Sequence, residues 1–215
     1  MQDAAWIGKG VELCVDQVAK AYGARRVLRD FSLTAHGGEV VAITGANGSG
    51  KSTLLRIVAG LLRPARGTIT LRVGAESFAE VGDRRRRVGY ASPDLALYPE
   101  LTGRENLHFF AVMRGRDSAE ACDTDLRAVG LADRGGDRVS AYSSGMRQRL
   151  RLAFARGANA PILLLDEPSL ALDSEGVTLV GEMVVEQRAR GGVTLLATND
   201  ARESALGDRV VALSR

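Results

Sequence analysis

A glycine-rich run between an apolar segment and a helical segment constrains the fold more than any other part of the sequence. The run, Gly45-Ala-Asn-Gly-Ser-Gly-Lys-Ser-Thr53, matches the phosphate-binding pattern G-x-x-x-x-G-K-[ST] in full. It follows the apolar run 40–44, which predicts a buried strand, and it opens a helical pattern that continues to about Gly60. Because the motif requires this order of strand, loop and helix, the sequence predicts a P-loop.

The residue types of this loop indicate its chemistry. Glycines allow backbone N–H groups to turn towards bound phosphates, and the start of the following helix adds a partial positive charge. In such a loop Lys51 reaches the β- and γ-phosphates, and the hydroxyl of Ser52 is a ligand of Mg²⁺. We therefore expect a nucleotide to contact Gly45, Asn47, Gly48, Ser49, Gly50, Lys51, Ser52 and Thr53.

A second apolar run ends in two carboxylates. The run 162–165 predicts a buried strand, and Asp166 and Glu167 follow it directly. Since ligands of α/β sheets bind at the carboxyl ends of the strands, both side chains are expected beside the P-loop. Asp166 is then placed to hold Mg²⁺, and Glu167 is placed to polarise a water for attack on the γ-phosphate. Together the two motifs predict a site that hydrolyses the γ-phosphate of a bound nucleotide.

The rest of the chain predicts an α/β protein with a largely parallel core sheet, because short β-branched or leucine-rich runs alternate with longer helical patterns. Further strands are expected over 12–18, 67–73, 193–198 and 209–213, and a further helix around 176–190. The strand 67–73 reads as part of an antiparallel region. Helical patterns over 102–114, 119–130 and 144–156 indicate a helical subdomain inserted into the core.

Composition excludes several classes of protein. Two cysteines and two histidines among 215 residues exclude a disulfide framework and a histidine-rich metal site. No apolar run approaches the roughly 18 residues of a membrane span, and no secretion signal is recognisable, so we expect a protein of a reducing compartment. Any membrane role must then come from a partner.

The charge distribution does not favour nucleic acid as a partner. The net charge is +3, and the densest basic cluster is the run Arg84–Arg87. An anionic-lipid or nucleic-acid contact is one interpretation of such a run, but no aromatic residues interleave it to stack on bases. We expect the run to lie on a solvated loop or helix end.

A third motif gives nearly the whole chain a resemblance to the ATP-binding subunits of ABC transporters. The segment Tyr142-Ser143-Ser144-Gly145-Met146 is similar to the family signature LSGGQ, from which it varies at three of five positions. The resemblance implies that Ser143, Ser144, Gly145 and Met146 act in trans, closing over ATP bound to a second copy. It also implies that Tyr22 stacks on adenine, that Asp173 belongs to the D-loop, and that a membrane partner docks on the stretch 97–107.

The resemblance implies a fold, cofactors and partners. The expected fold is a P-loop NTPase (RecA-like) core with an antiparallel β part and an inserted α-helical subdomain, in one nucleotide-binding domain over 1–215. The core would comprise 1–86 and 157–215, and the helical subdomain with the signature 87–156. The expected cofactors are ATP and Mg²⁺. The expected partners are a second nucleotide-binding subunit, identical or different, and an exporter-like integral-membrane permease, which would hold the chain at the cytoplasmic face of the membrane.

Two departures from the family pattern bear on the rate of hydrolysis. Pro93 stands at the position of the Q-loop glutamine, and Asn199 stands at the position of the switch histidine. Asn199 can donate a neutral hydrogen bond to the γ-phosphate but carries no charge, and losing a charge-assisted contact costs about 1–3 kcal/mol. An alternative function is therefore a catalytically weak ATP-binding switch, or the degenerate half of a heterodimer. A soluble ABC protein of translation or repair, or a P-loop kinase, fits the length and motif order less well.

Overall fold

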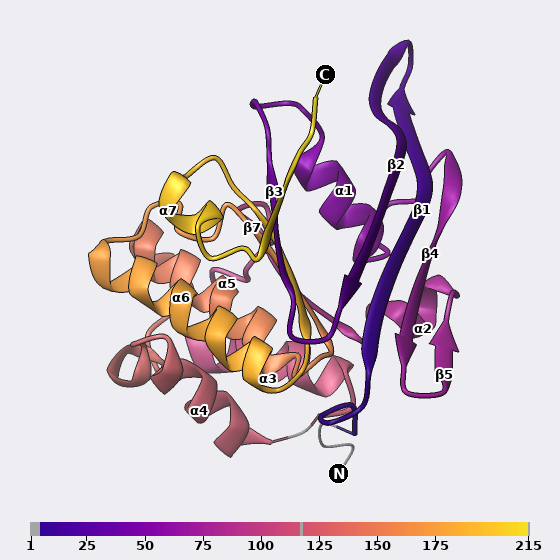
Figure 1. Cartoon of the computed structure of the whole chain (residues 1–215). Helices are drawn as coiled ribbons and strands as arrows, with labels where there is room; N and C mark the ends of the chain where they lie inside the picture. Colours follow the sequence, from indigo (N-terminus) through magenta and orange to yellow (C-terminus); the bar gives the residue numbers. More distant parts are fainter. Residues whose placement is uncertain (1–4, 117, 215) are drawn as a thin grey trace.

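The computed structural model describes residues 5–116 and 118–214, which form two sheets and a group of helices (Figure 1). The strands are β1 (Val11–Tyr22), β2 (Arg25–His36), β3 (Val40–Thr44), β4 (Arg66–Val73), β5 (Glu76–Phe78), β6 (Val88–Ala91), β7 (Ile162–Asp166), β8 (Val193–Ala197) and β9 (Arg209–Ala212). The helices are α1 (Lys51–Val58), α2 (Val81–Arg85), α3 (Gly103–Met113), α4 (Ala119–Ala128), α5 (Ser144–Gly157), α6 (Ser174–Ala189) and α7 (Ala201–Ser204), with short 3₁₀ turns at Ala132–Arg134 and Val139–Ala141.

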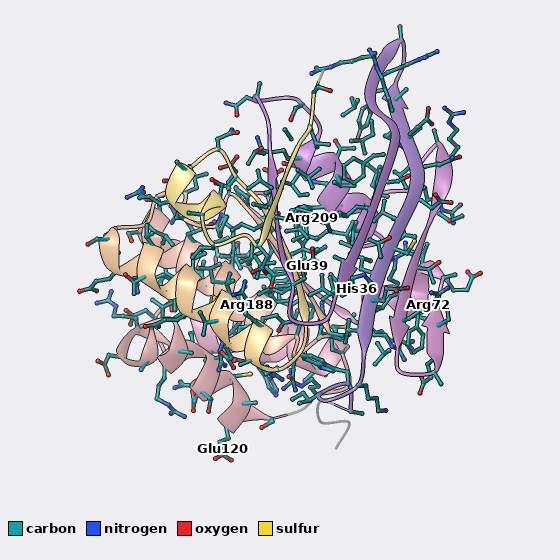
Figure 2. The ribbon with its side chains drawn as sticks, viewed as in Figure 1. His36, Glu39, Arg72, Glu120, Arg188 and Arg209 are labelled. Atoms are coloured by element: carbon teal, nitrogen blue, oxygen red, sulfur yellow. The ribbon has the colours of Figure 1, made fainter. Side chains whose placement is uncertain are left out.

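The strand order confirms the predicted fold class. One sheet is antiparallel with the order β2-β1-β4-β5, and the other is parallel with the order β6-β7-β8-β3-β9. Strand β2 was not predicted from the sequence, because its long segment 25–36 mixes arginines with apolar residues. In the parallel sheet, β9 pairs with β3 and is tied to the residue before β3 by an ion pair of 2.9 Å between Arg209 and Glu39 (Figure 2).

The parallel sheet is covered on both faces, which explains why its strands are almost entirely apolar. Along β7, Ile162 and Leu164 pack in a core that includes α1 and the antiparallel sheet. The alternate residues Leu163 and Leu165 pack in a second core with α5 and α6. Helix α1 thus lies between the two sheets (Figure 1). The loops that follow β3, β7 and β8 consequently meet at one edge of the sheet.

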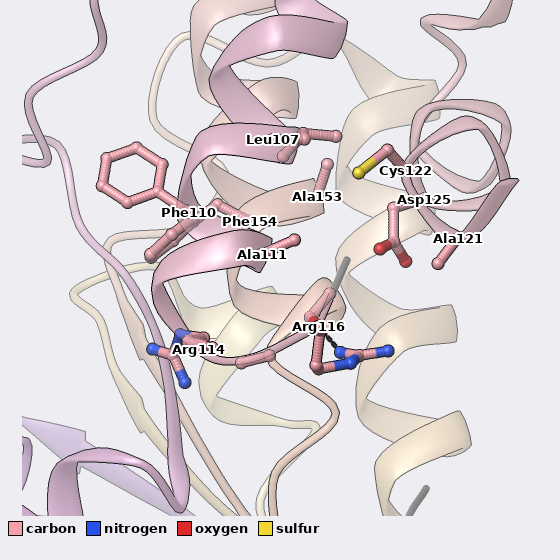
Figure 3. A pocket seen from close by; sticks show the side chains of 12 residues that line it. Leu107, Phe110, Ala111, Arg114, Arg116, Ala121, Cys122, Asp125, Ala153 and Phe154 are labelled. Carbon is pink, nitrogen blue, oxygen red and sulfur yellow. Dashed lines mark hydrogen bonds between the residues drawn. The ribbon is translucent and has the colours of Figure 1, made fainter. Parts of the chain in front are cut away.

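The three helices predicted for the inserted subdomain form as α3, α4 and α5. They enclose a small cavity of about 20 Å³, lined mostly by apolar side chains such as Leu107, Phe110 and Cys122 (Figure 3). Such a volume has room for about one water molecule. The expected stretch 87–156 begins with β6, which pairs with β7 in the core sheet. The helical part of the chain therefore starts after Ala91, and the domain boundaries remain a prediction.

The expectation of a solvated arginine run was wrong for Arg84. Its side chain is only 4% exposed and donates hydrogen bonds to the carbonyl oxygens of Val58, Ile69 and Ala79 at 3.3, 3.1 and 2.8 Å. Burial, followed by the neighbouring Arg85, lowers the pKa of its guanidinium. The run therefore contains a structural arginine that joins the end of α1 to β4 and to the segment after β5.

Candidate nucleotide-binding site

The P-loop connects β3 to α1 in the backbone conformation that its glycines allow. Gly45 and Gly48 have φ angles of 140° and 76°, in the region that favours glycine. A Cβ atom on Gly45 would lie 2.5 Å from the carbonyl oxygen of Leu213. Gly50 precedes α1 without a side-chain cap, and the first turn of that helix contains no acidic residue. The start of α1 therefore keeps its N–H groups and its partial positive charge for an anion.

Lys51 lies almost buried at the centre of the loop. Its ammonium donates to the carbonyl oxygen of Gly45 at 2.8 Å and to Oδ1 of Asn199 at 3.0 Å, and it lies 3.6 Å from Oε1 of Glu167. The Oγ atom of Ser49 is also buried, and it has no hydrogen-bond partner among the described residues. A buried cation and an unpaired hydroxyl within one glycine-rich loop form a site for phosphate oxygens.

Ser52 and Asp166 provide the two side-chain oxygens that suit Mg²⁺. The Oγ atom of Ser52 donates to Oδ1 of Asp166 at 3.1 Å, and Asp166 is 2% exposed. Burial raises the pKa of Asp166, an effect that hydrogen bonds from Ser52 and Tyr90 oppose. No group of three His, Cys, Asp or Glu side chains that could hold a metal occurs among the described residues. One hydroxyl and one carboxylate fit Mg²⁺, which takes its remaining ligands from water and substrate phosphates.

Glu167 follows β7 in an unusual backbone conformation. Its φ angle is 47°, which is rare outside glycine, and its N–H group donates to the carbonyl oxygen of Ala197 at 2.8 Å. The hydrogen bond to the end of β8 holds this strained residue in place. Such strain is typical of functional sites. In this protein the strained residue is Glu167, whose carboxylate is directed at Lys51.

Asn199, the residue predicted at the switch position, has a side chain that reaches two parts of the P-loop. Asn199 accepts from Lys51 through Oδ1, and its Nδ2 atom donates to Oδ1 of Asn47 at 2.8 Å. The amide thereby bridges Asn47 and Lys51. Pro93, at the other altered position, lies in the loop after β6 and adds no side-chain hydrogen-bonding group there.

A cavity of about 490 Å³ extends from the P-loop towards the turn between β1 and β2. Tyr22 lines it with half of its surface exposed, so its ring is available for stacking. Thr53 and Glu167 also line it. Sequence reasoning missed Arg25, which lines the same cavity and donates to the carbonyl oxygen of Gly48 at 3.1 Å. The feature that places Arg25 beside the cavity is its pairing opposite Tyr22 in the hairpin of β1 and β2.

The signature residues stand apart from this cavity. Ser143 is the N-cap of α5 and accepts from the N–H group of Met146 at 3.1 Å, while Ser144 is exposed. A Cβ atom on Gly145 would lie 3.1 Å from the carbonyl oxygen of Ala171. None of the four predicted signature residues lines the P-loop cavity of the same chain. Ser143 and Ser144 are exposed at the helix start, which leaves them open to a ligand held by another copy, while Gly145 and Met146 are partly buried.

Asp173 has structural contacts on two helices. It caps α6 by accepting from the N–H group of Gly176 at 2.9 Å, and it forms an ion pair of 3.0 Å with Arg149 on α5. These bonds hold the pKa of Asp173 below its usual value, with the bond from Gly176 contributing most. Gln148 adds a second link between α5 and the loop after β7 by donating to the carbonyl oxygen of Pro168 at 2.8 Å.

Known proteins with this arrangement are ATP-binding cassettes. The ABC transporter family model matches residues 28–170. The cytochrome c biogenesis ATP-binding export protein CcmA of Bradyrhizobium diazoefficiens is 38% identical over 86% of this chain and 92% of its own length. The uncharacterised ABC transporter ATP-binding protein YdbJ of Bacillus subtilis is 36% identical over 94% of this chain, which spans 66% of that relative.

Solved structures give the same result. The cassette MJ0796, in a dimeric post-hydrolysis state bound to ADP and Pi, superposes with a TM-score of 0.82 and 27% identity, over 94% of each chain. No helix in the described ranges is long and apolar enough to cross a membrane. The match to the family model, the identity with CcmA and the shared fold agree with the motifs: the chain belongs to the ABC transporter family, as one of its ATP-binding, ATP-hydrolysing subunits.

Proposed function

We propose that this ATPase works on Mg²⁺-ATP held by Lys51, Ser52 and Asp166, and that it drives an integral-membrane permease from the inner face of the membrane. The observation that carries the proposal is the convergence of Lys51, the Ser52–Asp166 pair and Glu167 at one sheet edge, with 3.6 Å between the Lys51 ammonium and the Glu167 carboxylate. Export is the direction of transport that we infer, because CcmA is named an export protein.

The proposed roles follow from the chemistry of each group. The N–H groups of the P-loop and Lys51 bind the phosphates and stabilise the negative charge that develops during transfer. Ser52 and Asp166 would hold Mg²⁺, which would supply positive charge that stabilises the phosphates during transfer. Glu167 orients and deprotonates the attacking water, Tyr22 stacks on the base, and Ser143 to Met146 close over the ATP of a second copy.

Replacing Lys51 by methionine tests the site itself. We expect the affinity for ATP to fall by about two orders of magnitude, because the buried ammonium is the side-chain cation nearest the phosphate position. The measurement is titration with a fluorescent ATP analogue. Lys9→Met is the matched control, since Lys9 is exposed and does not line the P-loop cavity. Equal affinities of the two variants would contradict the proposed site.

A second candidate function is an ATP-dependent switch that hydrolyses slowly. Asn199 and Pro93 favour it, because Asn199 carries no charge at the γ-phosphate and Pro93 has no polar side-chain group for Mg²⁺ or water. In that case the chain would act through nucleotide-dependent dimerisation, or as the weak half of a heterodimer. Single-turnover hydrolysis by the purified homodimer distinguishes the two functions, since turnover well above background excludes the switch.

Asn199→His is expected to accelerate single-turnover hydrolysis about tenfold or more, because imidazole can carry a charge that the amide cannot. Asn199→Ala is the matched control. It removes the hydrogen bonds to Lys51 and Asn47 without adding a charge, so it should slow the reaction. A histidine variant no faster than the wild type would show that position 199 does not limit the rate.

A further inference from the structure

We infer that Tyr90 is a positioning residue for the metal-binding carboxylate: its hydroxyl holds one oxygen of Asp166 and so keeps the other beside Ser52. The inference rests on the proposed function, because it takes Ser52 and Asp166 as the ligands of Mg²⁺. Sequence analysis gave Tyr90 no role, and nothing in the motif pattern requires a hydroxyl at this position.

The two oxygens of Asp166 have different partners. Oδ1 accepts from Ser52 at 3.1 Å, and Oδ2 accepts from the hydroxyl of Tyr90 at 3.3 Å. Both Asp166 and Tyr90 are buried, at 2% and 7% exposure. Among the described residues, these two hydroxyls are the side-chain donors to the carboxylate. Hydrogen bonds to both oxygens disfavour rotation of the carboxylate about its last bond, so the oxygen offered to the metal is the one beside Ser52.

The sheet brings Tyr90 to this point. Strand β6 pairs with β7 in parallel, and Tyr90 lies opposite Leu164, two residues before Asp166. The tyrosine side chain is long enough to cross to the neighbouring strand end. A phenylalanine would fill the same buried space but would leave Oδ2 without this donor. The hydroxyl is therefore the part of the side chain that carries the effect.

Tyr90 also connects the metal ligand to the loop in which Pro93 replaces glutamine. This loop begins directly after Ala91, the last residue of β6. Asp94 in the loop forms an ion pair with Arg56 of α1. The hydrogen bond from Tyr90 to Asp166 ties the proposed metal-binding carboxylate to the strand from which this loop leaves.

Tyr90→Phe tests the inference through metal-dependent nucleotide binding. The measured quantity is the Mg²⁺ concentration that gives half-maximal binding of a fluorescent ATP analogue. We expect this concentration to rise about fivefold, the equivalent of one lost hydrogen bond, because the carboxylate loses its fixed orientation. Binding of the same analogue in EDTA should not change, since the hydrogen-bond partner of the hydroxyl, Asp166, lies outside the P-loop.

Val88→Ala is the matched control. Val88 is buried two residues earlier on β6, and its truncation weakens the packing of the same strand without touching Asp166. It should leave the half-maximal Mg²⁺ concentration unchanged. An unchanged value for Tyr90→Phe, or an equal shift in Val88→Ala, would overturn the role of Tyr90. If binding by the wild type does not depend on Mg²⁺, the proposed metal site itself is wrong.

Discussion

Glu167→Gln is expected to slow ATP hydrolysis at least about a hundredfold while ATP binding is retained. Glutamine has the same shape but cannot accept a proton, and a positioned general base contributes about 10²–10⁴ in rate. The strained backbone of Glu167, with φ at 47°, and its hydrogen bond to Ala197 hold the carboxylate towards Lys51. The measurements are phosphate release under steady-state conditions and titration with a fluorescent ATP analogue.

Glu182→Gln is the matched control for this substitution. Glu182 is exposed on α6 and does not line the P-loop cavity, so the same chemical change there should leave the rate unaltered. If Glu167→Gln hydrolyses ATP as fast as the wild type, Glu167 is not the base. Loss of ATP binding in the same variant would instead assign the residue a role in holding the nucleotide or in the local fold.

The nucleotide site could be predicted because its groups are encoded locally. The phosphate-binding loop 45–53 depends on its local backbone geometry and on the helix that follows. Both features can be read from nine consecutive residues. Asp166 and Glu167 follow an apolar run, and the rule that parallel strands end at one edge brings them to the loop. Two short patterns were therefore enough to predict that Asp166 and Glu167 lie close to the P-loop, although more than a hundred residues separate them in the sequence.

Contacts that depend on the register between distant segments could not be predicted in this way. The amide of Asn199 reaches Asn47 across 152 residues of sequence, and the hydroxyl of Tyr90 reaches Asp166 across 76. Strand β6 has only four residues and follows four arginines, so its periodicity is too short to indicate a strand in the core. Pattern analysis identifies buried apolar residues, but the burial of a polar side chain such as Arg84, and the partner of its polar atoms, depend on the packing of the whole chain.

Arg84→Met is expected to lower the free energy of unfolding by about 3 kcal/mol, the largest effect on stability that we predict. The substitution keeps the length of the side chain but removes hydrogen bonds to the carbonyl oxygens of Val58, Ile69 and Ala79. Each buried carbonyl left without a donor costs about 1–3 kcal/mol. The gain from no longer burying a charge offsets part of this loss. Denaturant unfolding of both proteins measures the difference.

Arg86→Met separates this effect from the general loss of a positive charge. Arg86 belongs to the same run but is exposed, so its replacement should change the free energy of unfolding by no more than about 0.5 kcal/mol. Similar losses in the two variants would mean that charge or solubility, rather than the three hydrogen bonds, determines the result. A large difference would assign the stabilising role to Arg84, since the two arginines belong to the same run and differ in what their guanidinium groups contact.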